Sequence, residues 1–108
     1  MPRGYAVTRQ LVKDEARLRL AVPKGARLVL LDERGKELST RQFAALLGTD
    51  TAFAIGGADG FSAQTREAGD MMVRLSSLTL AHALAQVVLL EQLYRAATLL
   101  TGHPYHRD

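Results

Sequence analysis

The sequence contains no cysteine, and this absence narrows the chemistry open to the protein. A chain without cysteine has no disulfide framework, no thiol nucleophile and no thiolate ligand for a metal ion. Long apolar runs are also missing. The longest run in the C-terminal segment is 87–90, far short of the roughly 20 residues that span a bilayer. The first residues show no apolar segment of a secretory signal. We therefore expect a cytoplasmic protein with no membrane partner.

Length and composition predict one ordinary globular domain over residues 1–108. The chain is 47% hydrophobic and 23% charged, and it shows no repeat or low-complexity stretch. Its charge is uneven, with ten Lys and Arg against five Asp and Glu in residues 1–41, and four against six in residues 42–108. The basic first segment fits a polyanionic partner such as RNA, and it fits a solvated basic helix equally well.

Three short apolar segments alternate with helical patterns, which is typical of a parallel α/β sheet with flanking helices. Strands are expected at 27–31, 51–55 and 71–75, and the first two are apolar enough to be buried on both faces. Helices are expected at 7–20, from Ser39–Thr40 to Leu47, after Ser62 and at 82–101. Ligands of such sheets bind beyond the carboxyl ends of the strands, which here are Leu31–Asp32, Gly56–Gly57 and 75–80.

The last of these helices is apolar around most of its circumference. Its polar residues Glu91, Arg95 and Thr98 form one narrow stripe, and nearly everything else is Ala, Leu or Val. Such a helix is buried on several sides, which is hard to arrange in a monomer of this size. We therefore predict that a second copy covers it in a homodimer.

Two segments at the expected strand ends have ligand-binding character. The glycine-rich loop 56–60 would let a ligand approach the backbone, although it lacks the spacing of a phosphate-binding or dinucleotide motif and fits a tight turn as well. Leucines alternate with Ser and Thr in 75–80, so that hydroxyls could ring the edge of a purine while leucines cover its faces. The alternative is a buried loop whose hydroxyls satisfy their own backbone.

The C-terminal tail concentrates groups that handle protons and phosphates, in His103-Pro104-Tyr105-His106-Arg107. The chain has three histidines, His82, His103 and His106. No carboxylate or cysteine lies at the spacing of a metal ligand, so no metal site is predicted. Imidazole titrates near neutral pH, which favours a general base or an RNA contact. The sequence shows no nucleophile elbow of a catalytic triad and no carboxylate pair for glycoside hydrolysis.

Together these motifs resemble the ribosomal RNA large subunit methyltransferase H family of the SPOUT superfamily, over roughly residues 8 to 108. The resemblance is specific at five separated places: Leu31-Asp32, Ile55 to Gly60, Leu75 to Leu80 with His82, Leu93-Tyr94-Arg95-Ala96, and His103 to Arg107.

The resemblance implies a C-terminal deep trefoil knot, a rare exception to the rule that chains are not knotted. It also implies a homodimer that binds S-adenosylmethionine in the knot and methylates N3 of a pseudouridine in the helix 69 stem-loop of 23S rRNA, in the ribosome, with no DNA partner. Family members carry a further strand, helix and strand ahead of the matched segment. The resemblance therefore implies an N-terminally shortened chain, with a non-catalytic dimeric RNA- or cofactor-binding remnant as the alternative.

The resemblance also implies roles for particular residues. Those that would hold the cofactor are Leu31, Gly56, Leu75, Ser76, Ser77, Leu78, Thr79 and Leu80. Those that would serve the RNA and the reaction are His82, Arg95, Tyr105, His106 and Arg107. In-line methyl transfer depends on alignment and needs no metal. The N3 proton must leave, and our hypothesis is that His106 or Tyr105 assists its loss while Arg95 and Arg107 hold phosphate or developing charge.

Overall fold

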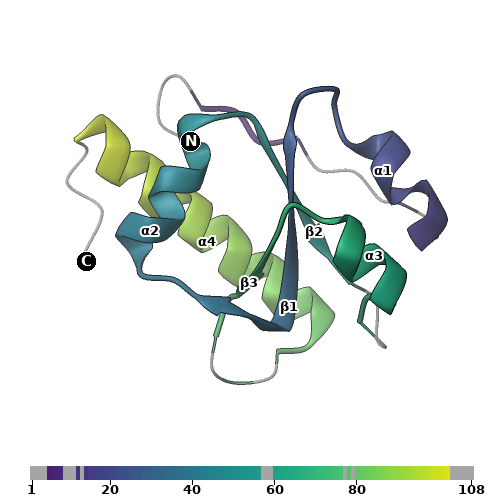
Figure 1. Cartoon of the computed structure of the whole chain (residues 1–108). Coiled ribbons are helices and arrows are strands. Elements are labelled where there is room, and N and C mark those ends of the chain that lie inside the picture. Colours follow the sequence, from purple (N-terminus) through teal and green to yellow (C-terminus); the bar gives the residue numbers. More distant parts are fainter. Residues whose placement is uncertain are drawn as a thin grey trace.

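Three parallel strands form the centre of the molecule. The computed structural model describes residues 5–8, 12, 14–56, 60–76, 78 and 80–102. Within them, strands β1 (Arg27–Glu37), β2 (Thr51–Ile55) and β3 (Met71–Arg74) form a sheet of order β2-β1-β3, and β1 pairs in parallel with both neighbours. Helices cover both faces of this sheet (Figure 1). The predicted parallel α/β architecture is confirmed.

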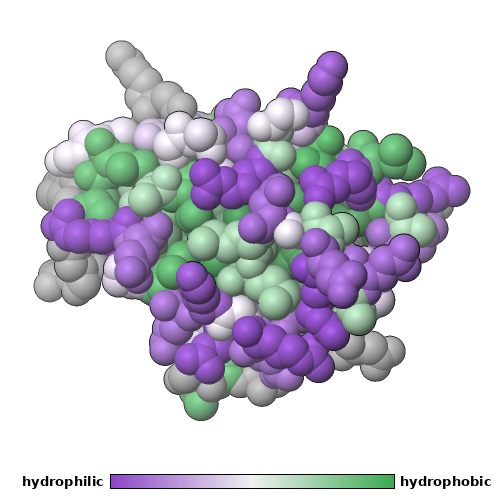
Figure 2. Space-filling model, in the orientation of Figure 1, coloured by the Kyte–Doolittle hydropathy of each residue, from purple (hydrophilic) through white to green (hydrophobic). Residues whose placement is uncertain are grey.

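The helices divide into two layers. Helix α2 (Thr40–Ala45), which continues as the 3-10 turn η2 (Leu46–Gly48), packs with the long helix α4 (His82–Thr101) on one face. Helix α3 (Ala63–Ala68) lies on the other side of the sheet with α1 (Leu18–Ala21) and the preceding 3-10 turn η1 (Glu15–Arg17) (Figure 1). Figure 2 shows polar side chains over much of the face in view, interrupted by apolar groups on the left and at the upper right.

The side chains of β1 alternate between two cores. Val29 and Leu31 pack with α2 and α4, while Leu28 and Leu30 pack with Phe61 on the opposite face. None of these four residues of β1 is more than 9% exposed, which confirms that this segment is buried on both faces. The same expectation is wrong for β2, whose residues are only half-buried because β2 lies at the edge of the sheet.

The capping signals in the sequence set several of the element bounds. Ser39 caps α2 through a reciprocal box with Gln42, in which the Gln42 N–H donates to the Ser39 hydroxyl at 3.1 Å and the Ser39 N–H to Gln42 Oε1 at 2.9 Å. Ser62 caps α3 in the same position. Helix α4 has the predicted bounds and ends at Gly102, which adopts a positive φ of 75°.

Three other expectations were wrong at their boundaries. Residues 7, 8, 12 and 14 are not helical, and the remaining part of 7–13 lies outside the described residues. The helical segment begins only after Asp14, because its carboxylate accepts the Arg17 N–H and caps the turn there. In addition, β1 does not end at Leu31 but continues to Glu37, and β3 ends at Arg74.

The second half of β1 leaves the ladder with β3 and then rejoins it. Val29 to Leu31 pair with Met71 to Val73, and the pairing resumes only where Lys36 lies opposite Val73. Residues 32–35 therefore bulge away from β3. The return requires glycine at position 35, because a Cβ atom there would lie 2.5 Å from the backbone nitrogen of Val73 and 2.6 Å from the carbonyl carbon of Met72.

We predict that Gly35→Ala destabilises the protein by about 1–3 kcal/mol or more, because the clash is with backbone that cannot rotate away. Chemical denaturation would measure the loss. Gly48→Ala is the matched control, since nothing lies within 4 Å of its added Cβ, and we expect it to be neutral or slightly stabilising. Equal stability of the two variants would contradict the close approach.

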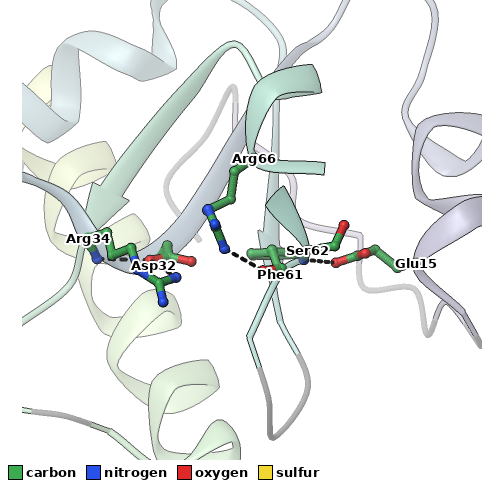
Figure 3. A network of polar contacts seen from close by, with 6 residues as sticks. All are labelled: Glu15, Asp32, Arg34, Phe61, Ser62 and Arg66. Carbon is green, nitrogen blue, oxygen red and sulfur yellow. Dashed lines mark hydrogen bonds and ion pairs between the residues drawn. The ribbon is translucent and has the colours of Figure 1, made fainter. Parts of the chain in front are cut away.

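A pair of polar contacts holds the α1 segment on α3. The Glu15 carboxylate accepts the Ser62 N–H at 2.9 Å, at the start of α3 (Figure 3), and the Arg19 guanidinium donates to the carbonyl of Ala68 at its end. An acidic group at the first turn and a basic group at the last complement the helix dipole. Hydrogen bonds from Ser62, through its side chain first and its backbone second, lower the pKa of Glu15 below its ordinary value of 4.5.

We predict a pH-dependent loss of stability in Glu15→Gln. A carboxyl whose pKa is lower in the folded state stabilises the fold above its unfolded pKa, and this contribution is lost as the pH falls through the folded value. The variant should therefore be less stable than wild type at pH 7, and the difference should vanish well below pH 4.5. Thermal unfolding at several pH values would test this, with Glu67→Gln on the exposed side of α3 as control. A difference that persists at low pH would refute the assignment.

Candidate functional site

A cleft of about 600 Å³ lies at the carboxyl ends of β2 and β3 and at the bulge of β1 that follows Leu31. This is the end at which open parallel sheets bind their ligands, and the volume is typical of small-molecule sites. Its walls come from these three places and from the first turn of α4: Leu31, Asp32, Glu33, Arg34, Ile55, Gly56, Gly60, Arg74, Leu75, Ser76, Leu78, Leu80, Ala81, His82 and Ala85.

A second recess, of about 480 Å³, opens at the other end of the sheet, where Gly25, Arg27, Thr49 and Asp70 contribute to its lining. The polar groups in this recess are already engaged in hydrogen bonds within the protein. The Asp70 carboxylate accepts the Leu28 N–H at 2.7 Å, and the Arg27 guanidinium donates to the Thr49 hydroxyl at 3.5 Å. The cleft at the carboxyl ends is therefore the better candidate for a functional site.

One wall of the cleft is a segment that crosses the end of the sheet. The segment leaves β3 at one edge, yet His82 Nδ1 lies 2.7 Å from the carbonyl oxygen of Gly56, just after β2 at the other edge. The chain therefore passes from the β3 edge of the sheet to the β2 edge between Leu75 and His82, on the side where the bulge of β1 lines the cleft. The Leu78 N–H donates to the Ser76 hydroxyl at 3.0 Å, so this hydroxyl also supports the turn of its own loop.

His82 ties the start of α4 to the end of β2. A carbonyl oxygen only accepts hydrogen bonds, so the imidazole donates through Nδ1–H to Gly56. In the neutral tautomer this leaves Nε2 as an acceptor for a proton or a donor group. The hydrogen bond thus fixes both the crossing segment and the tautomer of the ring.

Four charged residues line the cleft among apolar ones, and two of them, Asp32 and Arg74, are partly buried, whereas Glu33 and Arg34 are exposed. The side chain of Asp32 is only 4% exposed, and its Oδ1 accepts the Arg34 backbone N–H at 2.8 Å (Figure 3). The Arg34 guanidinium is 3.9 Å away and largely exposed, so it compensates this charge only weakly.

The second charge is Arg74, whose Nη2 pairs with Glu37 at 3.0 Å. Its Nε is buried and, among the described residues, has no hydrogen-bond acceptor. A buried donor without a partner costs roughly 1–3 kcal/mol, and more when it is charged. Sequence reasoning named Asp32 only as part of the strand end Leu31–Asp32, gave it no role, and did not name Arg74. The only available signal was their position, directly after the apolar cores of β1 and β3.

The structure brings together every predicted cofactor residue that it describes. Leu31, Gly56, Leu75, Ser76, Leu78 and Leu80 all line the cleft, although they come from three separate motifs. Ser77 and Thr79 lie outside the described residues.

The residues predicted to contact the RNA or take part in the reaction do not all lie at the cleft. His82 lines the cleft. Arg95 does not; it lies farther along α4, where its guanidinium pairs with Glu91 at 2.5 Å. Tyr105, His106 and Arg107 lie outside the described residues. Of the predicted reaction residues, the structure therefore places only His82 at the cleft.

Two kinds of feature are absent from the described part of the chain. No group of three or more His, Asp or Glu side chains there lies close enough together to hold a metal ion. Among the same residues, no helix combines the length and the apolar character needed to cross a membrane.

Comparisons with known proteins agree with one another. A family model described as "Predicted SPOUT methyltransferase" matches residues 3–106. The curated relative from Janthinobacterium sp. (strain Marseille) is 49% identical over 100 residues, covering 87% of this chain and 64% of that protein. Relatives from Polynucleobacter necessarius and Paraburkholderia phytofirmans are 49% and 50% identical, covering 91% and 90% of this chain and 77% and 66% of theirs.

Fold and cleft define a parallel α/β protein with a candidate small-molecule site at one end of its sheet. The chain belongs to the SPOUT methyltransferase family. All three relatives are named ribosomal RNA large subunit methyltransferase H, which confirms the family indicated by the motifs. The chain spans 64% of the length of the Janthinobacterium relative and 77% of that from Polynucleobacter necessarius.

Proposed function

We propose that the protein is an S-adenosylmethionine-dependent methyltransferase of large-subunit ribosomal RNA. Its product would be N3-methylpseudouridine in the helix 69 stem-loop of 23S rRNA, made on the ribosome in the cytoplasm. The observation that carries this proposal is the convergence of three motifs on one cleft at the carboxyl ends of the strands. The names of the relatives support the reaction class and the RNA substrate.

The cleft suits a cofactor that has a flat apolar part and a charged part. Leu31, Leu75, Leu78 and Leu80 offer apolar surface for the two faces of a purine, while backbone groups after each strand offer polar partners for its edge. Asp32 and Arg74 add one negative and one positive charge. When bound, the cofactor supplies a methyl group activated by a sulfonium.

The chain's own residues would align the reactants and remove a proton. In-line transfer is accelerated mainly by holding the nucleophile against the methyl carbon, and the N3 proton requires a nearby base. We assign the base to His106 or Tyr105, and the contacts to phosphate or developing charge to Arg107 and Arg95. Through its Nε2 acceptor, His82 would contact the RNA at the mouth of the cleft.

The proposal includes the trefoil knot of the family. The crossing of the chain from the β3 edge to the β2 edge between Leu75 and His82, where His82 attaches beside β2, supports it. In a knotted chain this crossing passes through a loop instead of lying over it, and the wall of the cofactor site is then fixed by the topology of the backbone.

The proposal also includes a homodimer formed by α4. One side of this helix packs into the core through Leu89, Leu93 and Ala96, whereas Leu84 and Val87 are 51% and 61% exposed. The exposed residues lie three apart and so share a face. An apolar face of this kind on a helix marks a protein interface, and a second copy of the chain is the partner that we propose.

We predict methyl transfer to 23S rRNA in ribosomes that lack the modification, measured with radiolabelled cofactor. His106→Ala should slow single-turnover transfer by about 10²-fold or more while leaving cofactor binding unchanged, because a positioned base contributes that much. His103→Ala, in the same tail, is the control and should be neutral.

The measurements of cofactor binding and methyl transfer distinguish the alternatives. Cofactor binding without transfer would replace the enzyme by the alternative, a non-catalytic dimeric RNA- or cofactor-binding protein. If His106→Ala transfers at the wild-type rate, His106 is not the base. Absence of cofactor binding would refute the proposal as a whole.

We predict that Val87→Asp dissociates the dimer, because an unpaired charge would be buried in an apolar interface. The dissociation constant should rise by at least roughly 100-fold, as measured by sedimentation equilibrium. Leu20→Asp is the control, since Leu20 is 85% exposed but lies on α1, away from this face. A dimer that persists in Val87→Asp would assign the interface elsewhere.

A further inference from the structure

Two charged side chains enter the cleft from neighbouring strand ends. Leu31 of β1 is the register partner of Val73 of β3, and Asp32 and Arg74 follow these two residues directly. The two side chains have opposite charges, yet each is paired with another residue. Arg34 lies near Asp32, and Glu37 pairs with Arg74. The bulge at 32–35 produces this arrangement, because it carries Asp32 away from β3 and returns Glu37 to it.

Both groups keep unused hydrogen-bonding capacity. On Asp32, Oδ1 accepts a backbone N–H, whereas Oδ2 has no hydrogen bond to any described residue. On Arg74, the buried Nε likewise lacks an acceptor within the described part of the chain. Each side chain therefore keeps one atom without a partner among the described residues, and the buried Nε of Arg74 is costly in this cleft unless a ligand supplies its acceptor.

We propose that Asp32 and Arg74 together recognise the amino-acid end of the cofactor, Asp32 through its α-ammonium group and Arg74 through its α-carboxylate. This inference rests on the proposed function, because it takes S-adenosylmethionine as the ligand. A zwitterion enters an apolar cleft at low cost only where both of its charges are met. A guanidinium is suited to a carboxylate by its planar fork of donors. Glu37 holds that guanidinium at the cleft and acts as a positioning residue.

The proposal assigns the two charges to the part of the cofactor that methyl transfer leaves unchanged. S-adenosylmethionine and its product S-adenosylhomocysteine carry the same amino-acid end, whereas 5′-methylthioadenosine lacks it. Asp32 and Arg74 should therefore contribute equally to the binding of the first two compounds and nothing to the binding of the third.

Calorimetric titration of the whole chain with these three compounds tests the proposal. Asp32→Asn and Arg74→Gln should each weaken S-adenosylmethionine and S-adenosylhomocysteine by roughly 10- to 100-fold, the range for a hydrogen bond to a charged group, and leave 5′-methylthioadenosine within about twofold. Arg17→Gln is the control, because this guanidinium is 72% exposed, pairs with Asp14 and does not line the cleft. It should bind all three compounds like wild type.

A fourth ligand keeps the test independent of whether the variants fold. Decarboxylated S-adenosylmethionine keeps the ammonium and the sulfonium but lacks the carboxylate, so wild type should bind it at least about tenfold more weakly than S-adenosylmethionine. Arg74→Gln should bind these two ligands equally, because the variant lacks the guanidinium that would bind the carboxylate.

The results that would contradict this inference differ from the result that would contradict the proposed function. The inference is overturned if wild type binds the decarboxylated ligand as tightly as S-adenosylmethionine, or if the variants weaken 5′-methylthioadenosine to the same degree. A loss confined to S-adenosylmethionine would also overturn it, since Asp32 would then recognise the sulfonium. If wild type binds neither S-adenosylmethionine nor S-adenosylhomocysteine, the proposed function fails together with the inference.

Discussion

The double burial of β1 is the constraint on which the rest of the structure depends. Leu28 and Leu30 anchor one helical layer and Val29 and Leu31 the other, and each large apolar side chain contributes about 1.5–3 kcal/mol when fully buried. Both neighbouring strands take their register from β1. A strand in this position cannot move without disturbing both layers, so any irregularity has to fall beyond its buried part, where the cleft lies.

The bulge after Leu31 links the fold to the site. It widens the space between β1 and β3, turns Asp32 into that space and brings Glu37 back against Arg74. Gly35 makes the return possible because its backbone approaches β3 more closely than any side chain would allow. The charged lining of the cleft is therefore a product of backbone geometry. Gly35 and Glu37, which do not contact the ligand in this proposal, hold Asp32 and Arg74 in the places from which they would bind it.

The sequence predicted those features that local chemistry determines. The strand at 51–55, the helix starts after Ser39 and Ser62, and the helix at 82–101 lie where expected, because strand apolarity, Ser caps and Gly102 act locally. The extension of β1 through Glu37 could not be predicted, since its polar residues carry no strand signal and pair only because β3 lies beside them. Likewise, the sequence places Asp32 and Arg74 at strand ends, but their unsatisfied atoms are a property of the packed structure.

Helix α4 joins the proposed cofactor site to the proposed interface. Within its first two turns, His82 and Ala85 line the cleft, while Leu84 and Val87 point away from the core. A rigid helix cannot shift one face without the other, so a second copy packed on the exposed face would also hold the wall of the cleft. The hydrogen bond between His82 and Gly56 extends this coupling to the end of β2. Dimerisation and cofactor binding should therefore reinforce one another, because both order the same two turns of helix.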